Sequence, residues 1–211
     1  QSDGFLWRKV IITAAVTIWG LRLSYHITKR GLGKPEDPRY TEWRKEYGSR
    51  FPIVSLFRVF LVQALFMWLI AMSLQVAQSA EMPDYITLTD IAGAAIWLTG
   101  FIIESSADRQ LARFIKDPAN KGRVMRYKLW KYSRHPNYFG EATMWWGIYI
   151  ISCSVEYGIF TVFSPALITY TLLKITGVSL MEETMFKDNP EYAEYKRTTS
   201  SFIPWIPGRN K

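Results

Sequence analysis

The sequence predicts an all-α fold, a multi-pass bundle of transmembrane helices with about five spans. Three observations lead to this prediction. Five apolar segments are long enough, or nearly so, to cross about 30 Å of hydrocarbon as helices. The charged residues are gathered in blocks between these segments, and basic and non-basic connections alternate along the chain. Residues 1–211 are therefore expected to form a single integral membrane domain.

The apolar segments, in order, lie at about 9–27, 57–79, 86–106, 139–155 and 157–181, and the fourth is short for a span. The alternative is a soluble all-α protein in which the same helices are buried. The second and third segments carry no charged stripe of the kind that a solvent-exposed amphipathic helix shows, which favours the membrane.

The connections between the segments differ in charge. Seven Lys or Arg lie between the first and second segments, nine between the third and fourth, and five after residue 181, whereas 81–84 and 154–157 have none. The positive-inside rule then predicts that the long basic loops and the C-terminus face the cytoplasm. Arg8 and Lys9 lie on the wrong side of this scheme. Because the chain also begins without Met, we expect that a segment precedes it.

Composition limits the classes of site and partner. A single cysteine, Cys153, excludes an intrachain disulfide, and with two histidines we expect no metal site. The net charge of +8 suits nucleic acid, anionic lipid or a phosphorylated ligand, but the spans argue against nucleic acid. Membrane lipids and a hydrophobic, lipid-like substrate are the expected partners. Phe202 and Trp205 in the tail suit the membrane interface.

The stretch at 129–141, LWKYSRHPNYFGE, is densest in groups that can bind a ligand. Asn137 and Glu141 are four residues apart, so on a helix they share one face, which Trp145 continues. Such a face could hold a carboxamide and lay an indole against a flat ring. The alternative is a helix start that Asn137 caps, with Glu141 near the positive end of the helix dipole.

Other polar residues are open to two interpretations. His135 is either a hydrogen-bonded structural residue or an acid or base. Arg22 and Lys174 lie inside predicted spans and are functional candidates on that ground, although snorkelling explains Lys174 better. Glu182 and Glu183 either stop the last helix or belong to a site.

The stretch at 130–141 resembles a sequence box of the steroid 5-alpha-reductase-like family of membrane reductases, in particular its broad, poorly characterised branch. Four boxes match in order over nearly the whole chain. They are E-D-x-R-Y-x-x-x-R at 36–44, A-D-x-Q at 107–110, W-x-Y-S-R-H-P-N-Y-F-G-E at 130–141 followed by Trp145, and E-E…Y-x-x-Y…F-I-P at 182–204.

The resemblance implies that NADPH reduces a carbon–carbon double bond in a steroid or other lipid. The cofactor would lie at the cytoplasmic ends of the helices, with Asn137 and Glu141 at its nicotinamide and Asp108 and basic residues at its adenosine and phosphates. The cofactor-binding residues implied in this way are Asp108, Gln110, Arg113, Lys116, Arg126, Tyr132, Arg134, His135, Asn137, Tyr138, Glu141, Trp145, Glu183, Tyr192 and Tyr195. The chain has no G-x-G-x-x-G, so a Rossmann fold would not hold the cofactor.

Steroid enzymes of this family polarise the substrate carbonyl with an acid and a tyrosine from N-terminal helices. The acid has no assignable counterpart in this sequence. Tyr25, beside Arg22 and His26, is the candidate phenol, and we expect Tyr25 and Arg22 to be catalytic.

Two other functions stay open. Isoprenylcysteine carboxyl methyltransferases are similar in R-H-P-x-Y-x-G, and they bind S-adenosylmethionine at the same place. The N-Y-F-G-E form and the basic loops favour a phosphate-bearing cofactor instead. The chain could also be a noncatalytic family member that acts as a structural subunit of a larger membrane complex with partner subunits.

Overall fold

The computed structural model describes residues 4–33, 35–36, 38–175, 177–178 and 189–206. Within these residues all regular structure is helical and no strand is present. The α-helices are α1 (Leu6–Gly31), α2 (Pro38–Tyr47), α3 (Phe51–Ser55), α4 (Val62–Ile70), α5 (Met72–Ser79), α6 (Leu88–Lys116), α7 (Pro136–Ser152), α8 (Phe163–Tyr170) and α10 (Pro190–Thr198). Turns of π-helix at Leu56–Leu61 and Thr171–Ile175 continue α3 into α4 and extend α8.

The predicted membrane bundle is confirmed. By length and composition, four helical stretches of the described chain can cross a membrane: Leu6–Gly31, Pro38–Ile70, Leu88–Lys116 and Gly158–Ile175. The remaining predicted span is α7, which has 17 residues and is therefore about 25 Å long. More than half of its residues are buried, so α7 is a central helix against which α5, α6 and α8 pack.

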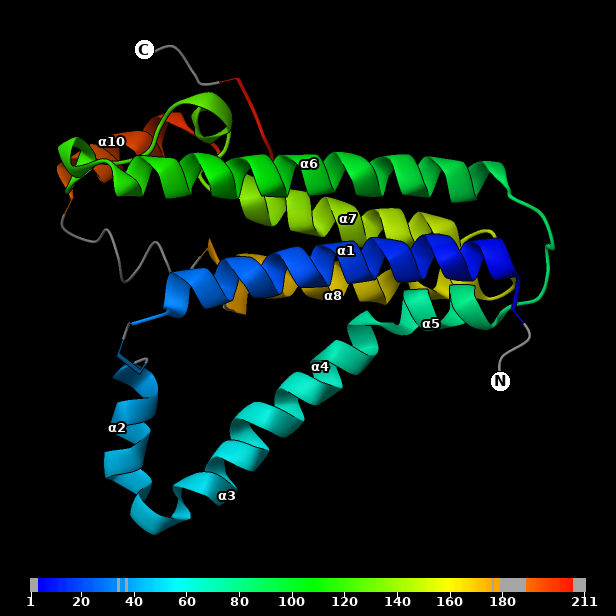
Figure 1. Ribbon diagram of the computed structural model, residues 1–211, viewed down its shortest axis with the longest axis horizontal. Helices are drawn as coiled ribbons and strands as arrows, with labels where there is room; N and C mark the ends of the chain where they lie inside the picture. The colour runs from blue at the N-terminus through cyan, green and yellow to red at the C-terminus, as the bar shows by residue number, and fades with distance from the viewer. Residues whose placement is uncertain (1–3, 34, 37, 176, 179–188, 207–211) are drawn as a thin grey trace.

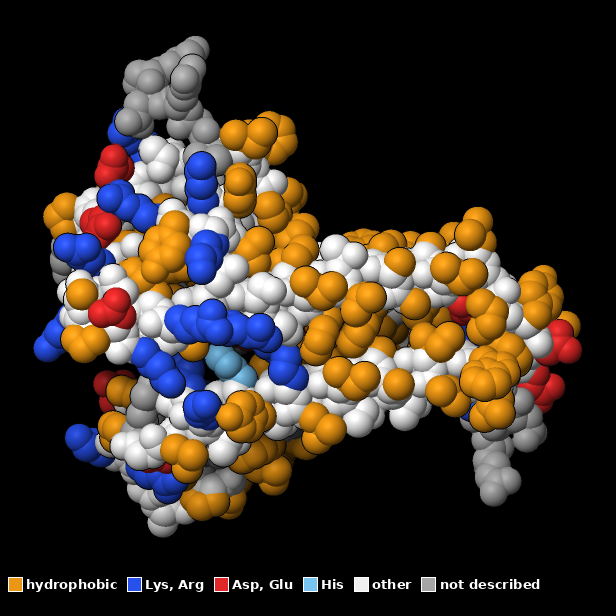
Figure 2. Space-filling view, turned by 45° about the horizontal axis from the view of Figure 1, so that its top comes forward, with side chains coloured by type: hydrophobic (Ala, Val, Ile, Leu, Met, Phe, Trp, Pro, Cys, Tyr) orange, Lys and Arg blue, Asp and Glu red, His pale blue; other side chains and the backbone are white. Residues whose placement is uncertain are grey.

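Figure 1 shows α1, α6, α7 and α8 side by side along the long axis of the molecule, with α5 at one end. The segment α2–α4 leaves the bundle at the other end and returns to it through α5. The loop between α6 and α7, α2 and α10 all lie at that second end. Lys and Arg side chains gather there in Figure 2, and acidic side chains lie at the opposite tip. The basic connections therefore share one end, although which side of a membrane they face stays a prediction.

A seam of glycines joins α6 to α7. Gly93 and Gly100 on α6 face Gly147 and Gly140 on α7, and the spacing is seven residues on both helices. A Cβ atom added at Gly140 would lie 2.6 Å from the amide nitrogen of Glu104, and one at Gly147 would lie 2.6 Å from that of Trp97. Small residues allow membrane helices to approach this closely. The seam thereby fixes the polar residues near Gly140 against those of α6.

A buried ion pair joins α1 to α6 at the end of the bundle away from the basic loops. The Arg8 Nε atom lies 2.9 Å from Asp90 Oδ1, and both side chains are fully buried. Arg8 Nη2 also donates to the carbonyl of Pro83 at 3.2 Å, and the Ser154 hydroxyl donates to Asp90 at 3.3 Å. The charge of Arg8, which the positive-inside scheme left unexplained, is therefore balanced inside the bundle.

The tail packs against the loop that precedes α7. Asn189 caps α10 by accepting hydrogen bonds from the amides of Glu191 and Tyr192. The expectation that Phe202 lies at the membrane interface is wrong, because its side chain is 9% exposed and packs on Phe139 and Ala142 in the core. Trp205, in contrast, is 73% exposed.

Candidate functional site

Two helices, α6 and α7, bring a cluster of carboxyl groups together toward the basic end of the bundle. Glu104 and Asp108 are one turn apart on α6, and Glu141 on α7 is close enough to Arg22 and Asp108 to interact with them electrostatically. We call Glu104, Asp108 and Glu141 the acid cluster. Glu104 and Asp108 are 3% and 8% exposed, so solvent screens their charges weakly.

Arg22 on α1 is the cation that bonds to the acid cluster. Its guanidinium donates to Asp108 Oδ2 at 2.9 Å and to Glu104 Oε1. The indole nitrogen of Trp19, one turn earlier on α1, donates to Glu104 Oε2 at 3.1 Å. An intramembrane carboxylate requires such partners. Arg22, which is predicted to be functional because it lies within a span, thus bonds to two carboxyl groups of α6.

The side-chain amide of Asn137 lies between α6 and α7, and of its two polar atoms only the nitrogen is hydrogen-bonded to a described residue. Its Nδ2 donates to Asp108 Oδ1 at 3.3 Å. Its Oδ1 is buried and accepts no hydrogen bond from the described residues. Because an Asp108 oxygen accepts this hydrogen bond, the amide nitrogen faces Asp108 and the amide oxygen faces away from it. A buried acceptor without a donor is costly unless something supplies one. Asn137 therefore presents an acceptor that suits a ligand N–H.

The start of α7 bears on the alternative reading of Asn137 as a helix cap. The helix begins at Pro136, so that Asn137 lies inside its first turn. The Asn137 side chain bonds to α6 and not to the backbone of its own helix. The capping interpretation is therefore wrong.

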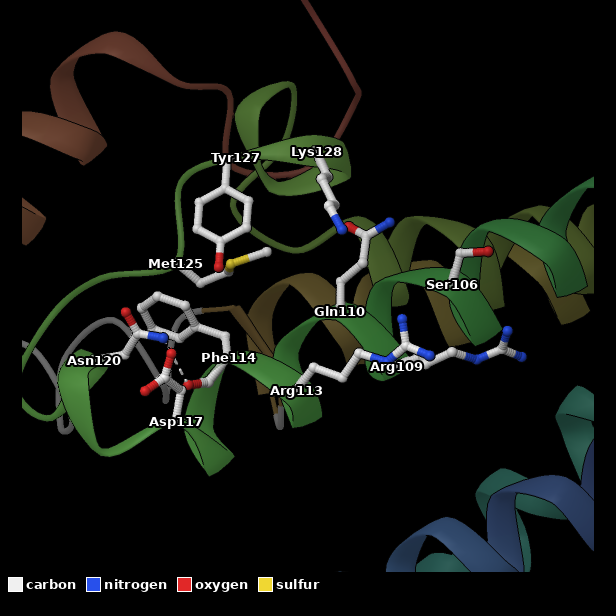
Figure 3. A pocket seen from close by; sticks show the side chains of 10 residues that line it. All are labelled: Ser106, Arg109, Gln110, Arg113, Phe114, Asp117, Asn120, Met125, Tyr127 and Lys128. Atoms are coloured by element: carbon white, nitrogen blue, oxygen red, sulfur yellow. Dashed lines mark hydrogen bonds between the residues drawn. The ribbon is translucent and has the colours of Figure 1, made fainter.

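A basic pocket of about 310 Å³ lies farther along α6, under the loop that follows it. Figure 3 shows Arg109, Gln110 and Arg113 projecting from α6 and Tyr127 and Lys128 facing them from the loop. Gln110 Oε1 accepts a hydrogen bond from the amide of Leu129 at 3.2 Å, which holds the loop over the helix. The predicted Gln110 and Arg113 thus lie together in a cavity that has two further cations and one carboxyl group, that of Asp117, and whose net positive charge suits an anion.

A family model described as "Protein of unknown function (DUF1295)" matches residues 1–199. The chain belongs to this family. No solved structure matches it.

Curated relatives of this family member include steroid dehydrogenases. An uncharacterized protein of Schizosaccharomyces pombe is 24% identical over 95% of the chain and 64% of its own length. The 3-oxo-5-alpha-steroid 4-dehydrogenase 1 of Mus musculus is 33% identical over 55% of the chain and 42% of its own length. That of Bos taurus is 35% identical over 35% of the chain and 29% of its own length. The chain thus spans less than two thirds of each relative, and the resemblance to the steroid 5-alpha-reductase-like family is confirmed.

Several other predicted residues of this DUF1295 member hold the loop before α7 to the tail. The Arg134 guanidinium is buried and donates to the carbonyls of Lys196 at 2.9 Å and Thr199 at 2.5 Å. The Tyr195 hydroxyl donates to the carbonyls of Trp130 and Ser133. These bonds are structural contacts, because they satisfy buried carbonyl groups. Any role for Arg134 or Tyr195 at a cofactor stays a prediction.

The aromatic residues of the predicted site differ in their surroundings and in how far they are exposed. His135 is 5% exposed and stacks on Tyr138, with ring centroids 5.5 Å apart. Trp145 is 9% exposed and meets Trp19 edge to face at 5.9 Å, beside the acid cluster. Tyr192 packs with Tyr195 and Val124 in a small core under α10, and Tyr132 is 40% exposed.

The remaining predicted residues lie apart from the acid cluster. Tyr25 is 66% exposed, and its hydroxyl accepts a hydrogen bond from Lys29 at 3.2 Å. Arg126 forms ion pairs with Glu191 at 3.4 Å and Glu194 at 3.3 Å. Lys116 is exposed on the last turn of α6. Glu183 lies outside the described residues.

Sequence reasoning did not select Glu104 or Trp19. Glu104 lies in an apolar segment four residues before Asp108, so the two carboxyl groups share a helix face. An acidic residue inside a predicted span is the signal that would have identified it. Trp19 carries no such signal, because an indole in a membrane helix is ordinarily a packing residue.

Proposed function

We propose that this protein is an NADPH-dependent membrane reductase that reduces a carbon–carbon double bond in a steroid or other lipid. The observation that carries the proposal is the buried Asn137 oxygen, which accepts no hydrogen bond from the described residues and belongs to an amide that Asp108 holds in place near Arg22 and Glu141. The steroid dehydrogenases among the relatives support the class of reaction and substrate.

The residues fit the two ends of such a cofactor. A nicotinamide carries a carboxamide whose N–H groups can donate to Asn137 Oδ1. The pyrophosphate and 2′-phosphate need cations, and the basic pocket provides Arg109, Arg113 and Lys128. Bound NADPH would supply a hydride.

The acid cluster has its own part in this reaction. Hydride addition to an alkene is completed by a proton, and carboxyl groups are common proton donors. One guanidinium, that of Arg22, bonds to Glu104 and Asp108, while Glu141 makes no direct ion pair within the described residues. Trp19, which donates to Glu104, packs against Trp145, and the two indoles would help to exclude water from the cluster. Under the proposal, a carboxyl of the cluster delivers the proton, while the hydrogen bonds from Arg22 hold Glu104 and Asp108 in position.

The test is ligand-dependent thermal stability of the detergent-purified protein. A ligand that binds only the folded state raises the unfolding temperature. NADPH is expected to stabilise the protein, and Asn137→Ala is expected to weaken its binding roughly ten- to hundredfold, the effect of leaving one buried donor unpaired. Gln75→Ala is the matched control, because Gln75 is an exposed amide at the other end of the bundle.

Each result has a definite meaning. Equal NADPH binding by wild type, Asn137→Ala and Glu141→Ala would refute the cofactor assignment. Stabilisation by S-adenosylmethionine in place of NADPH would indicate methyl transfer. No response to NADPH, NADH or S-adenosylmethionine would favour the structural-subunit reading. If NADPH binds, turnover with conjugated steroid and lipid enones is the next measurement.

A further inference from the structure

The tail after α10 exposes three large apolar side chains next to a cation. Ile203, Trp205 and Ile206 are 64%, 73% and 77% exposed. Together with Arg197, Thr198, Thr199 and Ser200 they line a groove of about 500 Å³. Exposed apolar side chains gathered in this way mark a contact surface when something holds them outward.

Hydrogen bonds to the backbone of this segment hold it in place. The amide of Trp205 donates to the carbonyl of Tyr132 at 2.9 Å, and the Ser133 hydroxyl donates to the carbonyl of Phe202 at 2.7 Å. The Phe202 ring is buried on the other side, against Phe139. With Phe202 anchored in the core, its neighbours Ile203 and Trp205 remain outside.

The charge around the groove is positive. Arg197 is among the lining residues, and no carboxyl group of the described chain lines the groove. The Arg197 side chain makes no ion pair with another described residue, whereas Glu191 and Glu194 of the same helix pair with Arg126. Lys131, directly before Tyr132, is also exposed. An apolar surface with Trp and cations matches the headgroup region of a membrane that contains anionic lipid.

The position of the segment fits that region. Tyr132 and Ser133, to which it bonds, lie within four residues before Pro136, where α7 begins. In Figure 1 the chain returns from α10 toward that end of α7. The exposed side chains thus lie level with the beginning of a central helix and not beyond the basic loops.

We propose that Ile203, Trp205 and Ile206, with Arg197 and Lys131, form an interfacial anchor that binds an anionic phospholipid of the surrounding bilayer. The apolar side chains enter the boundary between headgroups and acyl chains, and the two cations bind the lipid phosphate. The anchor also fixes the loop at 132–133, four residues before Asn137. This inference is independent of the proposed reductase activity.

The test uses the full chain in nanodiscs of phosphatidylcholine, alone or mixed with phosphatidylglycerol. Cys153 is the single cysteine, so Cys153→Ser allows one fluorophore to be placed by Ile206→Cys. We expect a nitroxide on the lipid headgroup to quench this fluorophore strongly. We expect iodide in the aqueous phase to quench it only weakly, because a label in the membrane interface is shielded from water. The matched control is Ala193→Cys on the exposed part of α10, where the opposite pattern is expected.

Two results would overturn the proposal. One is iodide quenching at residue 206 as strong as that at residue 193, which would place the segment in water. The other concerns the two cations. We expect phosphatidylglycerol to increase headgroup quenching in the parent chain, and we expect no such increase in the double variant Arg197→Gln and Lys131→Gln. An increase that persists in this variant would show that these cations do not bind the lipid. Unchanged thermal stability of each variant verifies that it folds.

Discussion

The glycine seam makes a quantitative prediction about Gly140, which lies between Asn137 and Glu141 on α7. In Gly140→Ala the new Cβ would lie 2.6 Å from the amide nitrogen of Glu104, whereas ordinary contact begins at 3.4 Å. The helices must therefore separate by about 0.8 Å. The neighbouring atoms are backbone, which cannot rotate away as a side chain can. Overpacking of this kind costs about 1–3 kcal/mol.

Gly20→Ala is the matched control for this variant. Gly20 lies within α1, and a Cβ atom there would meet nothing within 4 Å. Both variants replace glycine by alanine in a helix and so gain the same propensity, about 1 kcal/mol. The difference between them therefore isolates the packing cost. For a chain of this size, about 1–3 kcal/mol corresponds to a difference of roughly 2–12 °C in unfolding temperature.

Thermal unfolding in detergent, followed by tryptophan fluorescence, measures this difference. A second readout is NADPH affinity, because the Asn137–Asp108 hydrogen bond, at 3.3 Å, would break on the same displacement. Gly140→Ala should unfold below Gly20→Ala and bind NADPH more weakly. Equal unfolding temperatures for the two variants would refute the close approach of α6 and α7.

Two further predictions concern the buried polar contacts. Arg8→Met leaves Asp90 buried without its cation and should lower the unfolding free energy by about 3–5 kcal/mol, whereas the joint change with Asp90→Leu should restore most of it. Denaturation in detergent compares the single and joint variants, and equal losses would argue against the pair. Tyr195→Phe removes the donor to two buried carbonyls and should cost about 1–3 kcal/mol. Tyr170→Phe, at an exposed position, should unfold like wild type, and a Tyr195→Phe variant of equal stability would contradict the contact.

The fold could be predicted from the sequence because membrane helices are set by local composition. Apolar length and the alternation of basic loops depend only on the residues of each segment. The pairing of α6 with α7 could not be predicted in this way. Gly93 and Gly100, like Gly140 and Gly147, show their spacing in the sequence, but nothing local says which glycines meet.

The sequence identifies the residues of the candidate site better than it identifies the contacts between them. The rule that a charge inside a span has a function or a partner selected Arg22, and the structure supplies the partners, Glu104 and Asp108. The same rule applied to Glu104 would have completed the cluster. The Phe202 prediction failed because a tail without helical or strand periodicity gives no sign of which aromatic side chains point inward.

The Arg8–Asp90 pair also has a consequence for synthesis at the ribosome. Asp90 follows Arg8 by 82 residues, which takes roughly 4–16 s to translate at about 5–20 residues per second. During that interval Asp90 is not yet present to pair with the Arg8 guanidinium. If the basic loops face the cytoplasm as predicted, this lone charge opposes the final orientation of α1. The ion pair can therefore form only after α6 has been made, so it ties α1 to a helix that enters the bilayer later.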